Sequence, residues 1–317
     1  MKAALCQIAP LLLDRAATLE KVAGAIRDAA SKGATLACFG ETLVPGYPLW
    51  LERTDGARFD SELQKRLQSL YLREGVCIED GDLAPAQDTA RETKCWVVLG
   101  VAERPRDRGA HTIYCSRVVI DDEGRIASVH RKLMPTWEER LAWGVGDGHG
   151  LVVHEVGGFT LGALNCWENW MPLARAALYA QGETLHVAIW PGGEHNTRDI
   201  TRFIARESRS YVLSASGFVR GRDIPADFPA RDRIVQSEDE VILNGGSCAA
   251  GPDGEWLLEP RVCEEGVFIV EMDPARVREE RLTIRAGGAG AAVEDDLVLR
   301  LHDAVARGEV GGDVAPA

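Results

Sequence analysis

The sequence lacks the features that mark several classes of protein. No apolar run reaches the roughly 18 residues of a membrane-spanning helix, and residues 1–13 do not have the composition of a signal peptide. No repeat of about 20 to 50 residues occurs, which excludes a solenoid. Basic residues are few, because 36 Lys and Arg stand against 49 Asp and Glu, for a net charge of −13. We therefore expect a cytoplasmic protein with neither nucleic acid nor a membrane as partner.

The cysteines and histidines do not have the spacing of a disulfide framework or a metal site. No C-x-x-C pair and no H-E-x-x-H motif occur. The eight cysteines are scattered through apolar segments, at positions 6, 38, 77, 95, 115, 166, 248 and 263. We therefore expect reduced thiols and no bound metal.

The apolar pattern along the chain predicts an α/β fold in a single domain. Residues 2–8 have the character of a strand, a helix is expected from Asp14 to about Gly33, and residues 35–39 form a buried strand. Hairpins expected over 111–130 and 151–164 interrupt the alternation of strands and helices. This combination indicates a mixed sheet, or a pair of sheets, with helices outside.

The remaining segments continue the same pattern. We expect helices at 51–75, 82–94, 171–181 and 199–210, and strands at 95–102, 185–190, 211–216, 247–250, 255–258 and 266–271. Residues 221–240 are rich in charge and contain proline, which favours a long surface loop or lid. The glycines at 287, 288 and 290 favour a flexible connection over a phosphate-binding loop, because no lysine follows them at the required spacing.

The segment 161–181 contains the first candidate for chemistry. Cys166 lies where an expected strand gives way to a helix. Free backbone N–H groups at such a turn lower the pKa of a thiol and can hold a developing oxyanion. Cys166 is thus a candidate nucleophile, and an inert packed thiol is the alternative.

Three charged residues follow other strand ends. Glu41 comes after the strand at 35–39, Lys132 after the hairpin at 111–130, and Glu139 a few residues later. A carboxylate can act as base toward the thiol, an ammonium can stabilise negative charge on the substrate, and a second carboxylate can orient the ammonium. Together with Cys166 they would form a covalent hydrolase, whereas a solvated loop charge is the alternative for Glu41.

The residues alone are also compatible with two other functions. One is a cysteine-histidine hydrolase, for which the histidines at 111, 130, 149, 154, 186, 195 and 302 are possible partners, although none has a recognisable peptidase spacing. The other is a binding protein without catalytic activity.

Three short motifs, in order, resemble those of the nitrilase (carbon-nitrogen hydrolase) superfamily. They are Gly40-Glu41-Thr42, His130-Arg131-Lys132-Leu133 and Asn165-Cys166-Trp167-Glu168. The resemblance covers roughly residues 2–273. It implies a four-layer α-β-β-α sandwich of two mixed sheets flanked by helices, formed by residues 1–285. Residues 286–317 are then an extension, partly flexible or at a dimer interface, and a homodimer or higher homo-oligomer is expected.

The same resemblance implies the roles of the site residues and the absence of a cofactor. Glu41 would be the general base, Lys132 the stabiliser of the tetrahedral intermediate, Cys166 the nucleophile and Glu139 an additional active-site glutamate. Residues beside the motifs are expected to form the substrate pocket, and the backbone N–H of Trp167 is expected to join Lys132 in holding the developing anion. The pocket residues expected are Tyr47, Trp137, Trp167, Trp190 and Pro191.

The residues that follow the cysteine resemble the true nitrilase branch of the superfamily. Cys166-Trp167-Glu168-Asn169 carries this likeness. It implies hydrolysis of an organic nitrile by water to the carboxylic acid and ammonia, through a thioimidate and a thioester. The alternatives are an aliphatic amidase or a cyanide-hydrolysing enzyme of the same superfamily. The chain departs from the branch at 286–297, where nitrilases commonly have a Gly-His-Tyr-x-Arg-Pro-Asp-like segment, and its short tail predicts no long filaments.

Overall fold

The computed structural model describes residues 1–283 of the chain. The predicted extension at 286–317, the glycines at 287–290 and His302 lie outside the described residues. In the part described, no helix is both long enough and apolar enough to cross a membrane.

The first of two sheets has six strands in the order β13-β1-β2-β3-β4-β5. The β1–β2 and β2–β3 pairs are parallel, and the other pairs are antiparallel. The strands are β1 Lys2–Gln7, β2 Leu36–Phe39, β3 Trp96–Glu103, β4 Tyr114–Ile120, β5 Ile126–Arg131 and β13 Gly266–Glu271.

The second sheet has the order β10-β11-β9-β8-β7-β6, with β12 also paired to β11. Its central strands β7, β8 and β9 are parallel, and its other pairs are antiparallel. The strands are β6 His154–Val156, β7 Phe159–Asn165, β8 Leu185–Trp190, β9 Tyr211–Ser216, β10 Phe218–Arg220, β11 Val241–Ala250 and β12 Trp256–Val262.

The two sheets pack face to face, and the alternation of side chains in β1 shows how. Ala3 and Leu5 point into the core between the sheets, where they join Phe159 and Leu161 of β7. The intervening Ala4 and Cys6 point to the opposite face and pack beneath helices. Both faces of the strand are therefore buried, which requires a further layer on the outside.

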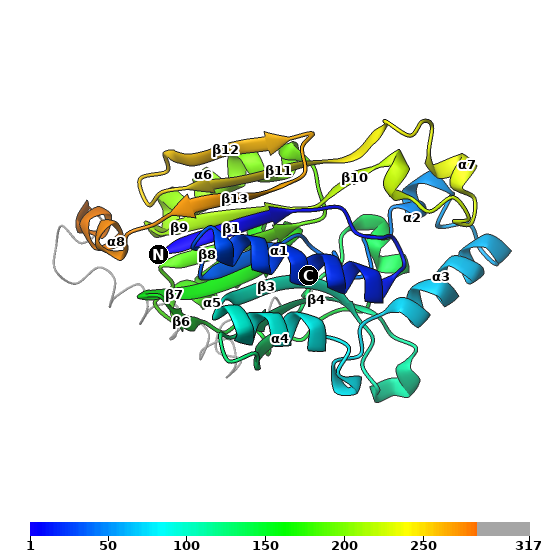
Figure 1. Ribbon diagram of the computed structural model, residues 1–317, viewed down its shortest axis with the longest axis horizontal. Coiled ribbons are helices and arrows are strands. Elements are labelled where there is room, and N and C mark those ends of the chain that lie inside the picture. Colours follow the sequence, from blue (N-terminus) through cyan, green and yellow to red (C-terminus); the bar gives the residue numbers. More distant parts are fainter. Residues whose placement is uncertain (284–317) are drawn as a thin grey trace, which may run out of the picture.

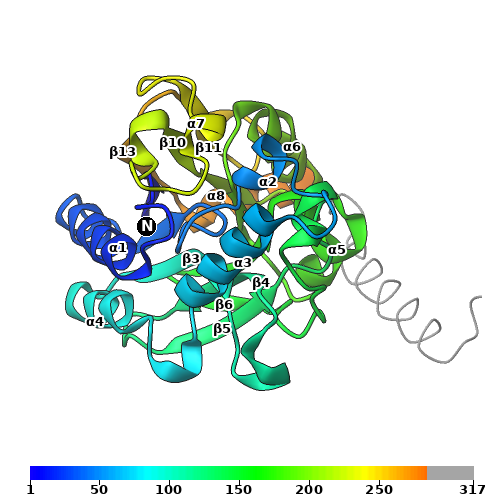
Figure 2. The ribbon, with the colours of Figure 1, turned by 90° about the vertical axis from the view of Figure 1, so that its right-hand side faces the viewer.

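Helices supply the two outer layers. Figure 2 shows α1 and α4 on one side of the molecule and α5 and α6 on the other, and Figure 1 shows α2, α3 and α7 at one end with α8 at the opposite end. The helices are α1 Arg15–Ser31, α2 Trp50–Arg53, α3 Glu62–Glu74, α4 Ala84–Thr93, α5 Pro172–Tyr179, α6 Glu194–Ser208, α7 Arg231–Ile234 and α8 Pro274–Glu280. The predicted α-β-β-α sandwich of two mixed sheets is confirmed.

Some element boundaries differ from the prediction. The single helix expected at 51–75 is two helices, α2 and α3, because Asp55 and Asp60 between them adopt positive φ angles of 59° and 57° that end helical geometry. Helix α6 starts at Glu194 rather than 199, and β11 starts at Val241 rather than 247. The loop expected at 221–240 contains the short helix α7.

Candidate active site

The β2 strand delivers Glu41 to the interior through a turn that contains one tightly packed glycine, Gly40, and lies against a second, Gly100. Gly100 of β3 passes so close to this turn that a Cβ there would collide with the backbone of Gly40 and Glu41. The Glu41 N–H donates to the carbonyl of Trp190 at 3.0 Å, which ties the turn to β8 of the other sheet. Only 2% of Glu41 is exposed, so the solvated loop charge considered from the sequence does not describe it.

The β5 strand delivers Lys132, and a 3-10 turn at Trp137–Leu141 delivers Glu139. The Lys132 N–H donates to the Cys115 carbonyl at 2.8 Å, which continues the pairing of β5 with β4. Glu139 is the third residue of its turn and closes a capping box with Thr136, whose N–H donates to Glu139 Oε2 at 2.6 Å. The lysine and the carboxylate are thereby fixed by separate backbone contacts.

Cys166 lies at the end of β7 in a strained conformation. Its φ angle is +44°, in the left-handed region that residues other than glycine rarely adopt. Asn169 holds this geometry by donating from Nδ2 to the Cys166 carbonyl at 2.8 Å. His186 bridges Asn169 Oδ1 and the Glu183 carboxylate, each at 2.8 Å, so a fully buried chain of polar side chains supports the turn.

The four predicted residues meet in one buried cluster. Lys132 Nζ lies 3.0 Å from Glu41 Oε1 and 2.7 Å from Glu139 Oε2. One ligand atom from each of Glu41, Glu139 and Cys166 lies within 4.8 Å of the other two. Such a set is close enough to hold a cation, but the Lys132 ammonium already forms ion pairs with both carboxylates.

Burial and charge set the protonation of this cluster. Burial, with the charge of Glu139, raises the pKa of Glu41 to about 7, against the lowering effect of Lys132. Burial and the Glu41 carboxylate raise the pKa of the Cys166 thiol well above its usual value, while Lys132 and the Trp167 backbone N–H act in the opposite direction. Burial alone would lower the pKa of Lys132, but the surrounding acidic groups raise it well above its usual value. The resting cluster therefore holds a thiol and an ammonium.

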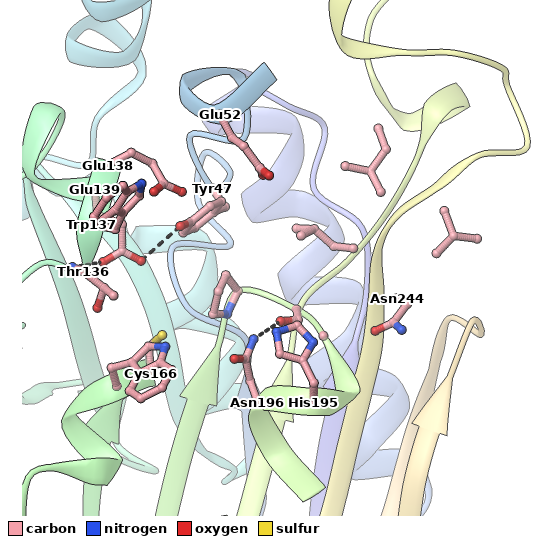
Figure 3. Close-up of a pocket in the computed structure, with 17 residues that line it drawn as sticks. Tyr47, Glu52, Thr136, Trp137, Glu138, Glu139, Cys166, His195, Asn196 and Asn244 are labelled. Atoms are coloured by element: carbon pink, nitrogen blue, oxygen red, sulfur yellow. Dashed lines mark hydrogen bonds between the residues drawn. The ribbon is translucent and has the colours of Figure 1, made fainter. Parts of the chain in front are cut away.

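A pocket of about 450 Å³ opens above Cys166 and Glu139. Figure 3 shows these two side chains on one side, His195 and Asn196 on the other, and Glu52 above them in the view. Three acidic residues, Glu52, Glu138 and Glu139, contribute to its lining. Within residues 1–283, no Lys or Arg does. The lining residues are Tyr47, Glu52, Thr136, Trp137, Glu138, Glu139, Cys166, Trp167, Pro191, Gly192, Gly193, His195, Asn196, Val241, Ile242, Leu243 and Asn244.

The structure brings four of the five expected pocket residues to this cavity and leaves one elsewhere. Tyr47, Trp137, Trp167 and Pro191 line it, and the Tyr47 hydroxyl also donates to Glu139 Oε1 at 3.0 Å. The Trp190 side chain does not reach the pocket, because it is fully buried in the core beneath α6. Its contribution to the site is the backbone carbonyl that holds Glu41.

Several residues near the chemistry were not found from the sequence. The Cys115 thiol donates to Glu41 Oε1 at 3.2 Å, although nothing in its strand singles it out. Asn196 and the segment 241–244 also line the pocket. They were missed because α6 and β11 begin several residues before the predicted helix and strand. His195 lines the pocket too, but in the described part of the chain no histidine forms a hydrogen bond with the Cys166 thiol.

Comparison with known proteins places this geometry in a family. A sequence model described as carbon-nitrogen hydrolase matches residues 2–281. The chain belongs to the carbon-nitrogen hydrolase family. The prediction of this superfamily, and of an enzyme acting on carbon–nitrogen bonds, is thereby confirmed.

Members of the family similar to this chain include proteins of the nitrilase branch, as predicted. An aliphatic nitrilase of Sinorhizobium fredii is 34% identical, over 86% of this chain and 86% of that protein. A nitrilase of Pseudomonas syringae pv. syringae is 35% identical, over 87% of this chain and 82% of that protein. Among solved structures, an amidase of the nitrilase superfamily from Nesterenkonia AN1 has the same fold, with a TM-score of 0.63 at 19% identity over 90% of this chain and 96% of that one.

Proposed function

We propose that this carbon-nitrogen hydrolase converts an organic nitrile and two waters into a carboxylic acid and ammonia. The observation that carries the proposal is the position of Cys166, which lines the pocket directly beside the buried cluster of Glu41, Lys132 and Glu139. The similarity to nitrilases over most of the chain supports the nitrile over other substrates of the family.

In the first half of the reaction, the Cys166 sulfur bonds to the nitrile carbon. The thiol proton passes to the Glu41 carboxylate and then to the nitrile nitrogen, which gives a thioimidate. Negative charge that develops on this nitrogen is stabilised by the Lys132 ammonium and by the Trp167 backbone N–H, which lies at the Cys166 sulfur. Glu139 holds the ammonium in place from its other side.

In the second half, Glu41 acts as base toward two waters in turn. The first water adds to the thioimidate carbon, and the tetrahedral intermediate expels ammonia to leave a thioester. The second water adds to the thioester carbon, and the carbon–sulfur bond breaks to release the acid and restore the Cys166 thiol. Neither half requires a metal or an organic cofactor, which is part of the proposal.

A substrate panel tests the reaction and the preference of the pocket. We expect ammonia release from neutral aliphatic or arylaliphatic nitriles, and at least about tenfold lower kcat/KM for nitriles that carry a carboxylate, because Glu52 and Glu138 line the pocket and no Lys or Arg does among residues 1–283. Cyanide and the amides that match each nitrile are run in parallel. Turnover of amides alone would support the amidase alternative and contradict the nitrile reaction, and turnover of cyanide alone would support the cyanide-hydrolysing one.

The pKa of Glu41 sets a pH dependence for the reaction. Because the base must be ionised, kcat/KM for a neutral nitrile should rise with pH, with a midpoint at about 7. In the variant Glu139→Gln this midpoint should move to lower pH, because the Glu139 charge is one of the groups that raise the pKa of Glu41. The measurement is a pH–rate profile of each protein, scaled to its own maximum. An unchanged midpoint in the variant would argue against Glu41 as the base.

The location and assembly of the protein belong to the same proposal. We propose a cytoplasmic homodimer or higher homo-oligomer, on the strength of the acidic sequence and the family resemblance. A single domain formed by residues 1–285 is likewise part of the proposal.

A further inference from the structure

Two residues of the sequence motifs, His130 and Glu168, have no part in the proposed reaction. His130 precedes Lys132 by two positions, and Glu168 follows Cys166 by two positions. Both side chains are fully buried, and neither lines the substrate pocket. Burial of a carboxylate lowers the free energy of unfolding unless its oxygens accept strong hydrogen bonds.

Glu168 meets that requirement through hydrogen bonds with the two segments that contain Lys132 and Cys166. Its Oε1 accepts from the N–H of Leu133, the residue after Lys132, at 2.6 Å. Its Oε2 accepts from the N–H of Asn165, the residue before Cys166, at 2.9 Å. With its proton on Nε2, His130 donates to both oxygens at 3.0 and 3.2 Å. These bonds lower the pKa of Glu168 against the opposing effect of burial, so the carboxylate stays ionised.

The two segments joined in this way come from different sheets. Lys132 follows β5 of the six-stranded sheet, and Cys166 follows β7 of the seven-stranded sheet. We propose that Glu168, held by His130, is a positioning residue that sets the location of the Lys132 ammonium relative to the Cys166 sulfur. This rests on the proposed roles of Cys166 and Lys132.

The expected size of the effect follows from geometry. Displacement of a catalytic group by about 1 Å can reduce the rate about a hundredfold. In Glu168→Gln, one of the two oxygens becomes an NH₂ group, which cannot accept from the backbone N–H that faces it. One of the two segments is then released, while the pocket lining and its affinity for substrate are left in place. We expect kcat to fall about a hundredfold with KM changed by less than about threefold.

A matched control is available at Glu103 of β3, the carboxylate that binds the residue between His130 and Lys132. Glu103 is a buried carboxylate that accepts two hydrogen bonds from Arg131, at 2.9 and 2.7 Å, but it does not contact the Cys166 turn. Glu103→Gln removes a comparable buried charge and should lower the melting temperature to a similar degree while kcat stays within about threefold of wild type. A loss of kcat in this control equal to that in Glu168→Gln would overturn the positioning role.

The alkylation of Cys166 by iodoacetamide gives a second measurement that needs no nitrile. We expect the rate at Cys166, followed by peptide mass spectrometry, to fall at least about tenfold in Glu168→Gln, while the exposed Cys263 reacts as in wild type. Failure of nitrile turnover in the wild type would thus count against the proposed function without touching the positioning role. Unchanged alkylation and unchanged kcat in folded Glu168→Gln would overturn that role.

A second variant decides the matter if Glu168→Gln does not fold. His130→Ala removes one donor to Glu168 but keeps both of its backbone bonds. We expect a folded protein whose kcat is about tenfold reduced, with KM little changed. A kcat equal to wild type in folded His130→Ala would overturn the proposal.

Discussion

Replacing Cys166 with alanine is expected to reduce turnover about a millionfold, to the background rate. The substitution removes the only sulfur that lines the pocket among residues 1–283, so no covalent intermediate can form. Wild-type protein quenched during turnover should carry a nitrile-derived adduct on the Cys166 peptide in mass spectrometry, and Cys166→Ala should carry none. The melting temperature should change little, because the sulfur is a small part of the core beneath α6.

Cys115→Ala is the matched control for this prediction. Its thiol also contacts Glu41, at 3.2 Å, but it is fully buried in β4 and does not line the pocket. The hydrogen bond from Cys115 lowers the pKa of Glu41, so its loss should shift the pH–rate profile to higher pH and leave turnover measurable at the plateau. Equal inactivation of both variants, or adducts on the Cys115 peptide, would contradict the assignment of Cys166 as the nucleophile.

Replacing Lys132 with methionine is expected to impair both catalysis and stability. Turnover should fall about a thousandfold, because the variant loses the cation that we propose stabilises charge on the substrate nitrogen. The free energy of unfolding at neutral pH should fall by about 3 kcal/mol, because Glu41 and Glu139 stay buried without their shared partner. This is the lower end of the usual range, since a Glu41 carboxyl with a pKa of about 7 can take up a proton at little cost.

Two further variants test that explanation. In Lys132→Met combined with Glu139→Gln, one of the two unpaired carboxylates is gone, so part of the stability should return while activity should not. Arg131→Met, at the adjacent position, breaks the ion pair with Glu103 outside the pocket and should keep turnover. Urea denaturation measured beside the kinetics separates the two effects. Full stability in Lys132→Met would show that the cluster does not depend on its cation.

The parts of the fold that the sequence predicted best are those with a local signal. Asp14 was expected to begin the first helix, and its side chain does accept from the Ala17 N–H as an N-cap. The strand at 185–190 was placed with its correct bounds because a mostly apolar run of six residues is followed by Pro191 and two glycines. The division of the helix at 51–75 was missed, since Asp55 and Asp60 have left-handed backbones that no periodicity reveals.

In the site, too, local motifs could be predicted from the sequence, whereas contacts between distant residues could not. Glu41, Lys132, Glu139 and Cys166 were predicted from strand ends and recognisable motifs, and the structure places them in one cluster. The direction of the Trp190 side chain was not predictable, because every residue of β8 is buried and no polar alternation tells which face it points to. The contact between Cys115 and Glu41 joins residues 74 positions apart and depends on how β4 packs beside the Glu41 turn.

The division of the proposed catalytic residues between two sheets has a consequence for the evolution and engineering of this protein. Glu41 and Lys132 follow strands of one sheet and Cys166 follows a strand of the other, so the distances between these side chains depend on how the two sheets pack. We therefore expect substitutions in the core between the sheets, such as at Leu5 and Phe159, to change the rate although these side chains do not line the pocket. Variation in that core is a route by which selection can adjust turnover while the binding surface is preserved.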